Sequence, residues 1–316
     1  MPYVVGRPRP DLRPPQLTTT VPREYVHRAA VSEVFLTGWR ADGGAGSGEP
    51  AFTVTAQWPR SHALFAREDG YQDPMLLLES VRQIGSLLAH AEFGVPFGHQ
   101  FVMSRLSAAA EPALFAAGPT PTETELRTVC RDTVYRDGRL AAMRYDVTVL
   151  RDGRPLGTAT AAFQCVSPAV YRRLRGERTP LARRATPPAV APREVGRTSA
   201  RHVVLAEPEP GVRHRWELRV DTAHPTYFDH PVDHVPGMVL LEAARQAAHA
   251  ATGLPDALVL GVRGTFERYA ELDLPCWIEA RPEPAGADGD IPVRVTGTQQ
   301  RRTVFTADVT LRPGAR

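Results

Sequence analysis

The fold is decided by residues 228–246, which read FDHPVDHVPGMVLLEAARQ. A polar turn with two Asp-His pairs opens this stretch, and a Pro-Gly pair then precedes an apolar run of helix-forming residues at 238–251. Proline suits a helix start because its fixed φ fits the first turn and its missing N–H would be unpaired there. A helix this apolar is expected to be wrapped by other elements, so its polar residues must pair or carry chemistry. Those that share one helix face, at i, i+3 and i+4, are Glu242, Arg245 and Gln246.

A second copy of this unit lies earlier in the chain. Residues 71–83 read YQDPMLLLESVRQ, and Glu79, Arg82 and Gln83 repeat the Glu-x-x-Arg-Gln face. His62 precedes the first helix at nearly the spacing by which His224 precedes the second. Internal repetition on this scale predicts two units of similar structure.

Length and local composition predict where these units begin and end. A chain of 316 residues is long enough for about two domains of roughly 150 residues each. Residues 1–20 read as a flexible lead-in, and the charged, Pro-rich segment 171–196 reads as a linker. The expected units are therefore 21–170 and 197–316.

Composition and charge exclude several functions. All 38 basic residues are Arg, and a net charge of +3 does not indicate a nucleic-acid-binding protein. The lack of Lys excludes Schiff-base chemistry, pyridoxal phosphate, biotin attachment and a P-loop lysine. No cofactor is expected.

The cysteines and the apolar runs give two further expectations, one on thiol chemistry and one on the cell compartment. Cys130, Cys165 and Cys276 are far apart and read as small buried strand residues, with a nucleophilic thiol as the alternative. No signal peptide and no apolar run of about 18 residues is found, which predicts a cytoplasmic protein without a membrane partner.

Period-two patterns flank each helix, which is expected over 74–93 in the first unit. Asp137-Gly138 and Asp152-Gly153 supply tight hairpin turns. The order of elements predicts an α+β fold, with one buried helix and an antiparallel sheet in each unit. Strands are expected at 26–39, 51–58, 99–108, 123–135, 139–150 and 154–166, and then at 202–206, 214–220, 257–266, 275–281, 291–299 and 303–311.

This plan and the run PGMVLLEAARQ resemble the hotdog fold, in which a curved antiparallel sheet wraps one long helix. The stretch is similar to the HxP…PG-x-x-x-x-EA motif of acyl-carrier-protein dehydratases, although the interval from His230 to Glu242 is about two residues shorter. A longer resemblance covers nearly the whole chain. VHRAAVSEVFLTGW, DPMLLLESVRQIGSLLAHAEFGVPFGHQFVM and HPTYFDHPVDHVPGMVLLEAARQAA resemble the A-factor biosynthesis hotdog family of γ-butyrolactone-type autoregulator synthases.

The resemblance implies a double hotdog, a pseudo-dimer within one chain. It also implies an acyltransferase that moves a β-ketoacyl group from acyl carrier protein to a hydroxyl of dihydroxyacetone phosphate. The expected partners are these two substrates, and association into a homo-oligomer is left open.

Such chemistry needs a base, donors for the developing oxyanion and a grip on the acceptor. Backbone N–H groups of Gly237 and Met238 at the helix start are the expected oxyanion donors. Glu242 is the expected base, and Arg245 is the expected phosphate ligand because guanidinium binds phosphate oxygens two at a time. The remaining candidates are Glu79 and His230 as catalytic groups, and Arg82, Gln246 and His234 as binding groups.

Each assignment has an alternative. A Glu-x-x-Arg face is also a plain ion pair that satisfies itself in a buried helix. His230 and His234 at i and i+4 have metal-ligand spacing, but the prolines hold the turn out of helix, so no metal is expected. A dehydratase, a thioesterase and a non-catalytic acyl-binding module remain as other functions.

Overall fold

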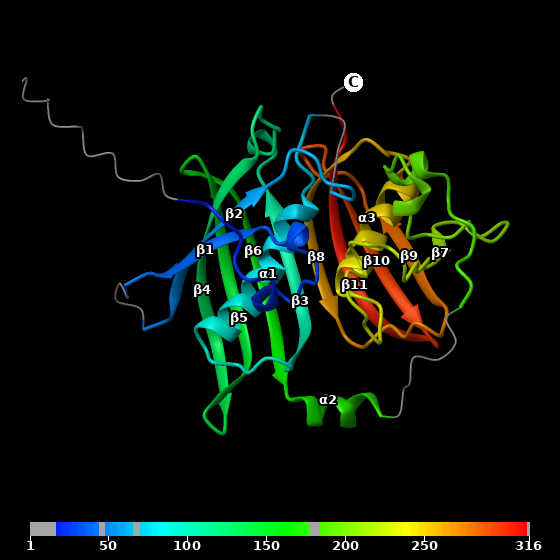
Figure 1. Cartoon of the computed structure of the whole chain (residues 1–316). Helices are drawn as coiled ribbons and strands as arrows, with labels where there is room; N and C mark the ends of the chain where they lie inside the picture. Colours follow the sequence, from blue (N-terminus) through cyan, green and yellow to red (C-terminus); the bar gives the residue numbers. More distant parts are fainter. Residues whose placement is uncertain (1–16, 44–47, 66–69, 177–183, 315–316) are drawn as a thin grey trace, which may run out of the picture.

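The computed structural model describes residues 17–43, 48–65, 70–176 and 184–314. Within them, eleven strands form one antiparallel sheet in the order β1-β2-β4-β5-β6-β3-β8-β11-β10-β9-β7 (Figure 1). The first half comprises β1 (Leu36–Ala41), β2 (Ala51–Trp58), α1 (Met75–Ala91), β3 (Gln100–Ala110), β4 (Thr122–Arg136), β5 (Arg139–Arg151) and β6 (Arg154–Val166). After α2 (Pro168–Arg175), the second half comprises β7 (Arg215–Glu217), α3 (Gly237–Thr252), β8 (Leu258–Phe266), β9 (Cys276–Pro282), β10 (Ile291–Gln299) and β11 (Arg302–Arg312).

Each half wraps its sheet around one helix. Helix α1 packs against β3, β5 and β6, and α3 packs against β9, β10 and β11 (Figure 1). Both helices are buried on nearly every side, as their apolar composition predicts. The predicted double-hotdog fold is confirmed.

The Asp-Gly turns fix the register of the long hairpins. Asp137 and Gly138 have φ of 50° and 74°, and Asp152 and Gly153 have φ of 52° and 74°. Two successive positive φ values are the type I′ geometry that matches the twist of paired strands. The hairpins β4–β5 and β5–β6 therefore form where the sequence predicts them.

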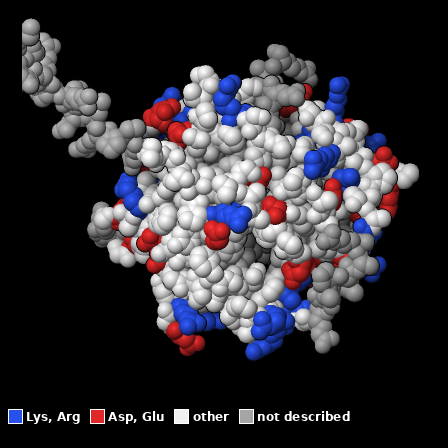
Figure 2. Space-filling model, in the orientation of Figure 1, with Lys and Arg blue, Asp and Glu red and all other residues white. Residues whose placement is uncertain are grey.

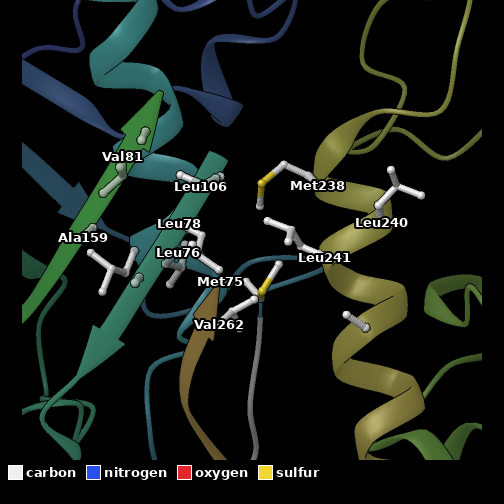
Figure 3. Packing of buried hydrophobic residues seen from close by; sticks show 14 of the residues in the cluster. Met75, Leu76, Leu78, Val81, Leu106, Ala159, Met238, Leu240, Leu241 and Val262 are labelled. Carbon is white, nitrogen blue, oxygen red and sulfur yellow. The ribbon is translucent and has the colours of Figure 1, made fainter. Parts of the chain in front are cut away.

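The two halves join edge to edge between β3 and β8, where Arg105–Ala109 pair with Thr265–Gly261. This junction sets α1 and α3 beside a shared apolar core. Figure 3 shows Met238 and Leu241 of α3 directed toward Met75 of α1. Gly264 of β8 permits the close packing of α3, because a Cβ there would lie 2.6 Å from Leu241 Cδ2.

Two of the expected strands are wrong over most of their length. In 26–39 only the residues from Leu36 onward form a strand, and 202–206 contains no strand beyond single bridges. A 3-10 turn lies at Val31–Glu33 within the first segment, and another, Ala200–His202, ends at the first residue of the second. The reason is that helix side chains take up their backbone hydrogen-bonding groups. The expected strand 214–220 shortens to Arg215–Glu217.

The predicted lead-in and linker lie partly outside the described residues, which exclude 1–16 and 177–183. At the start of the 171–196 segment the chain continues α2, whose first turn is capped by the Ser167 hydroxyl accepting from Val170 N–H. No helix among the described residues is long and apolar enough to cross a membrane.

Candidate active site

The polar turn before α3 forms two Asp-His dyads. Nδ1 of His230 lies 2.5 Å from Oδ1 of Asp229, and Nδ1 of His234 lies 2.8 Å from Oδ1 of Asp233. Each histidine is thus held by the aspartate that precedes it. The 42% exposed side chain of His230 leaves its ring open to a ligand.

The protonation of Asp229 determines which nitrogen of His230 is a base. Burial alone would raise the pKa of Asp229, but the hydrogen bond from His230 and the charge of Arg28 lower it to about 2. An ionised carboxylate only accepts hydrogen bonds, so Nδ1 of His230 carries the proton. Nε2 of the neutral ring is therefore the free acceptor, the arrangement that general-base catalysis requires.

Helix α3 begins without a side-chain cap. Its N-cap residue is Pro236, and no described residue accepts from the N–H groups of Gly237 or Met238. These donors, together with the positive end of the helix dipole, favour an oxygen that carries negative charge. The start of α1 differs, because Oδ1 of buried Asp73 accepts from Met75 N–H at 2.9 Å.

A cavity of about 680 Å³ lies between the two halves and contains both features. The turn and the start of α3 form one side, through His230, His234, Gly237 and Met238. The remaining lining is mixed. Its apolar side chains include Phe65, Phe101, Met103, Leu106, Phe163, Leu240, Phe266 and Val304, and its polar ones include Gln100, Glu267, Arg268, Gln299, Gln300 and Arg302. A cavity that combines apolar and charged side chains suits an acyl chain whose reacting end is polar.

The first half contributes cations to the same cavity. Arg82 of α1 lines it with a side chain that is 21% exposed, and Arg28 lines it with one that is 8% exposed. Both bind Glu79, with Arg28 Nη2 at 2.6 Å and Arg82 Nη2 at 2.7 Å. Arg28 also lies 3.4 Å from Asp229, so it bridges the helix of one half and the turn of the other.

Glu242 and Arg245 occupy a different, closed site. Glu242 is 0% exposed and binds Arg197 at 2.7 Å, Arg245 at 2.5 Å and Gln246 at 2.6 Å. The other guanidinium nitrogen of Arg245 binds Asp73 at 2.7 Å. None of these residues lines the cavity.

The polar face of each helix anchors the 3-10 segment of its own half. Gln83 accepts from Phe35 N–H and donates to Glu33 C=O, while Gln246 accepts from Val204 N–H and donates to His202 C=O. This matched pair of contacts is what replaces the expected strands. It indicates that the repeated Glu-x-x-Arg-Gln face stabilises the fold by holding these segments in place.

The structure places the expected site residues in two different surroundings. The oxygens of Glu242 are enclosed and bound to two guanidinium groups, and Glu242 does not line the cavity. Arg245 does not face a phosphate, since Glu242 and Asp73 use its donors. Gln246 and Glu79 are likewise buried behind other side chains. The structure brings the other expected residues together at the cavity: His230, His234, Gly237, Met238 and Arg82.

Two residues near the site, Arg28 and Asp73, were not predicted from the sequence. Arg28 orients Asp229, and Asp73 closes the start of α1. A signal for Arg28 was present, because REYVHR at 23–28 and REVGR at 193–197 place Arg28 and Arg197 at equivalent points before each helix. Asp73 had no comparable signal, since its carboxylate acts on the other half of the chain.

The three cysteines do not supply a nucleophile. Burial raises the pKa of Cys130, Cys165 and Cys276 to about 12, so the thiolate is scarce at neutral pH. None of them lines the cavity.

The two helices, each wrapped by its own part of the sheet, define the class of this protein, a double hotdog. Solved structures agree on the fold. The chain is similar to a 12:0-ACP thioesterase from Umbellularia californica, with a TM-score of 0.50 and 12% identity over 83% of this chain and 94% of that one. It is also similar to a structure assigned as an oleoyl thioesterase of Lactobacillus plantarum, with a TM-score of 0.55 and 12% identity over 86% and 100%.

Sequence comparison is more specific. The family model of the A-factor biosynthesis hotdog domain matches residues 11–167 and 179–314. A 2-oxo-3-(phosphooxy)propyl 3-oxoalkanoate synthase of Streptomyces virginiae is 50% identical, over 95% of this chain and 100% of the relative. A synthase of the same name from Streptomyces coelicolor is 42% identical, over 92% and 91%. The chain belongs to the A-factor biosynthesis hotdog family.

Proposed function

We propose that the chain is an acyltransferase that moves a β-ketoacyl group from acyl carrier protein to the hydroxyl of dihydroxyacetone phosphate, a step toward a γ-butyrolactone-type signalling molecule. The product named for its relatives is the ester of a 3-oxoalkanoic acid with that phosphorylated alcohol. Forming this ester requires a base, an oxyanion site and a phosphate ligand. The observation that carries the proposal is that His230, the start of α3 and Arg82 border one cavity.

In the proposed reaction the thioester carbonyl oxygen lies at the N–H groups of Gly237 and Met238. Nε2 of His230 takes the proton of the acceptor hydroxyl as its oxygen attacks the carbonyl carbon. The negative charge that develops on the carbonyl oxygen is stabilised by the helix start. When the tetrahedral intermediate collapses, the carbon–sulfur bond breaks and His230 returns the proton to the thiolate of the carrier.

Arg82 supports transfer over hydrolysis, because a thioesterase has no use for a phosphate ligand. Its guanidinium is partly exposed in the cavity, beside the more deeply buried Arg28. Two adjacent guanidinium groups suit a phosphate that carries two negative charges. Arg28 is also paired with Asp229, so the partly exposed Arg82, which shares Glu79 with it, is the guanidinium that would bind the phosphate.

The test uses a β-ketoacyl carrier protein with dihydroxyacetone phosphate, with unphosphorylated dihydroxyacetone, or with no acceptor, and mass spectrometry of the products. We expect the phosphorylated ester from the wild type and a rate roughly 10²–10⁴-fold lower for His230→Asn. Arg82→Gln should reduce the preference for the phosphorylated acceptor about ten- to hundredfold, since a charge-assisted hydrogen bond contributes about 1.5–3 kcal/mol. Arg82→Lys should restore part of it.

Free β-keto acid as the main product, at the same rate with and without an acceptor, would identify a thioesterase. An α,β-unsaturated acyl product would identify a dehydratase. An unchanged acceptor preference in Arg82→Gln would remove Arg82 from the phosphate site while leaving the role of His230 open to its own test.

A further inference from the structure

Helix α2 lies at the cavity and is fixed along one face. Buried Arg175 binds Asp233 at 2.9 Å and Glu271 at 2.7 Å, and its guanidinium stacks 4.4 Å from the ring centroid of Tyr269. Tyr171 donates its hydroxyl hydrogen to Asp233 at 2.7 Å. The helix is thus tied to the turn that holds the catalytic dyad, and Leu174 and Arg175 border the cavity.

The outer face of α2 has no partner in the described chain. Arg172 and Arg173 are exposed, and no described residue pairs with either of them. Val170 and Leu174 on the same short helix are 40% and 62% exposed. Figure 2 shows blue side chains at the lower edge of the molecule, where Figure 1 places α2. These two guanidinium groups, beside two exposed aliphatic side chains, form a surface for an acidic, partly apolar partner.

We propose that this outer face, formed by Val170, Arg172, Arg173 and Leu174, is the docking surface for the acyl carrier protein, an inference that rests on the proposed function. A carrier that delivers its acyl arm into the cavity must sit on a surface bordering that cavity, and α2 does so through Leu174. The carrier presents carboxylates to the two arginines and an apolar side chain to Leu174. Ion pairs of this kind raise the association rate and orient the arm without closing the cavity.

The test separates carrier recognition from catalysis by using two donors with the same acyl group. One donor is the β-ketoacyl carrier protein and the other is β-ketoacyl pantetheine, which lacks the protein. For the double variant Arg172→Glu/Arg173→Glu we expect kcat/KM with the carrier to fall about tenfold or more, mainly through KM. With the pantetheine donor it should stay within about twofold. Added salt should lower kcat/KM for the donor more steeply with the carrier than with pantetheine, because both reactions share the phosphate contact but only the carrier uses the α2 arginines.

The matched control is Arg213→Glu/Arg281→Glu, which makes the same change of charge. These arginines are exposed near β7 and on β9, at the far edge of the sheet, and neither lines the cavity. We expect the control to use both donors as the wild type does. An equal loss of kcat/KM with the carrier in the control would show that net charge alone causes the effect, and it would overturn the assignment of α2.

Two further results would overturn the docking proposal while leaving the transferase intact. In one, the α2 double variant keeps the wild-type kcat/KM with the carrier. In the other, it loses activity equally with both donors, which would make α2 part of the cavity rather than a docking surface. Failure of the proposed function looks different, because the wild type would then form no phosphorylated ester from either donor.

Discussion

Arg28 and Arg197 hold equivalent positions in the two halves but have different neighbours. Each binds the helix glutamate of its own half and a backbone carbonyl of the other, Thr226 for Arg28 and Leu64 for Arg197. Arg28 also reaches Asp229, whereas Arg197 lies 3.8 Å from Asp73 in the closed network. One arginine therefore supports a dyad that faces the cavity, and the other supports only the fold.

This difference gives a matched pair of substitutions. Removing one member of a buried ion pair costs about 3–5 kcal/mol, so Arg28→Met and Arg197→Met should lower thermal stability alike. Only Arg28→Met removes the cation beside Asp229, which keeps the Ala29 N–H and His230 as partners, so kcat should fall roughly ten- to hundredfold more in it than in Arg197→Met. Thermal denaturation and steady-state transfer rates at a temperature where both variants are folded measure the two effects. Equal losses of kcat would show that Arg28 acts through stability alone.

Many of the residues at the site could be predicted from the sequence, but not which of them line the cavity and which are buried in the fold. The DHPVDH turn and the Pro-Gly helix start predict His230, Gly237 and Met238 as site residues, and the structure places all three at the cavity. The spacing of the Glu-x-x-Arg-Gln face is the same whether the face borders a cavity or a buried segment, so the sequence does not show that its glutamate and glutamine are buried in both helices. Which of the two it faces depends on contacts far apart in sequence.

At the scale of elements, the two helix starts explain why the halves differ. At the start of helix α1 the Met75 N–H is bound by the Asp73 carboxylate, which is also paired to Arg245 of the other half. Helix α3 begins at Gly237, which lines the cavity together with Met238, and their N–H groups have no acceptor among the described residues. Strands and helices with a clear hydrophobic period were predicted correctly. The 3-10 segments were predicted as strands, because they are held by hydrogen bonds to helix side chains that are distant in the sequence.

The α3 start can be tested by removing a single N–H group. Gly237→Pro deletes the donor at a position where proline fits the first helical turn, and Gly237→Ala adds a Cβ but keeps the donor. That Cβ would lie 3.3 Å from the ring of Phe266, a tight contact common to both variants. We expect kcat for the proline variant to be about 10²–10³-fold below that of the alanine variant. Equal rates would show that the Gly237 N–H does not contact the oxyanion.

At the scale of the whole molecule, the β3–β8 junction makes one site from two units. It sets the turn and α3 of the second half against Arg28 and Arg82 of the first, while the equivalent space on the other side is filled by the Asp73–Arg245–Glu242–Arg197 network. The internal repeat predicts two similar units. It does not predict which helix faces which turn, because that depends on the edge-to-edge pairing of two strands about 160 residues apart.

The most direct test of this account is a crystal structure with β-ketoacyl pantetheine in which an amide replaces the thioester and so cannot transfer the chain. We predict one ligand per chain, with its amide oxygen within hydrogen-bonding distance of the Gly237 or Met238 N–H and its acyl chain among the apolar residues of the cavity. A second ligand at the start of α1, or a single ligand bound at Glu242 and Arg245, would contradict the claim that each chain has one active site, built jointly by its two halves.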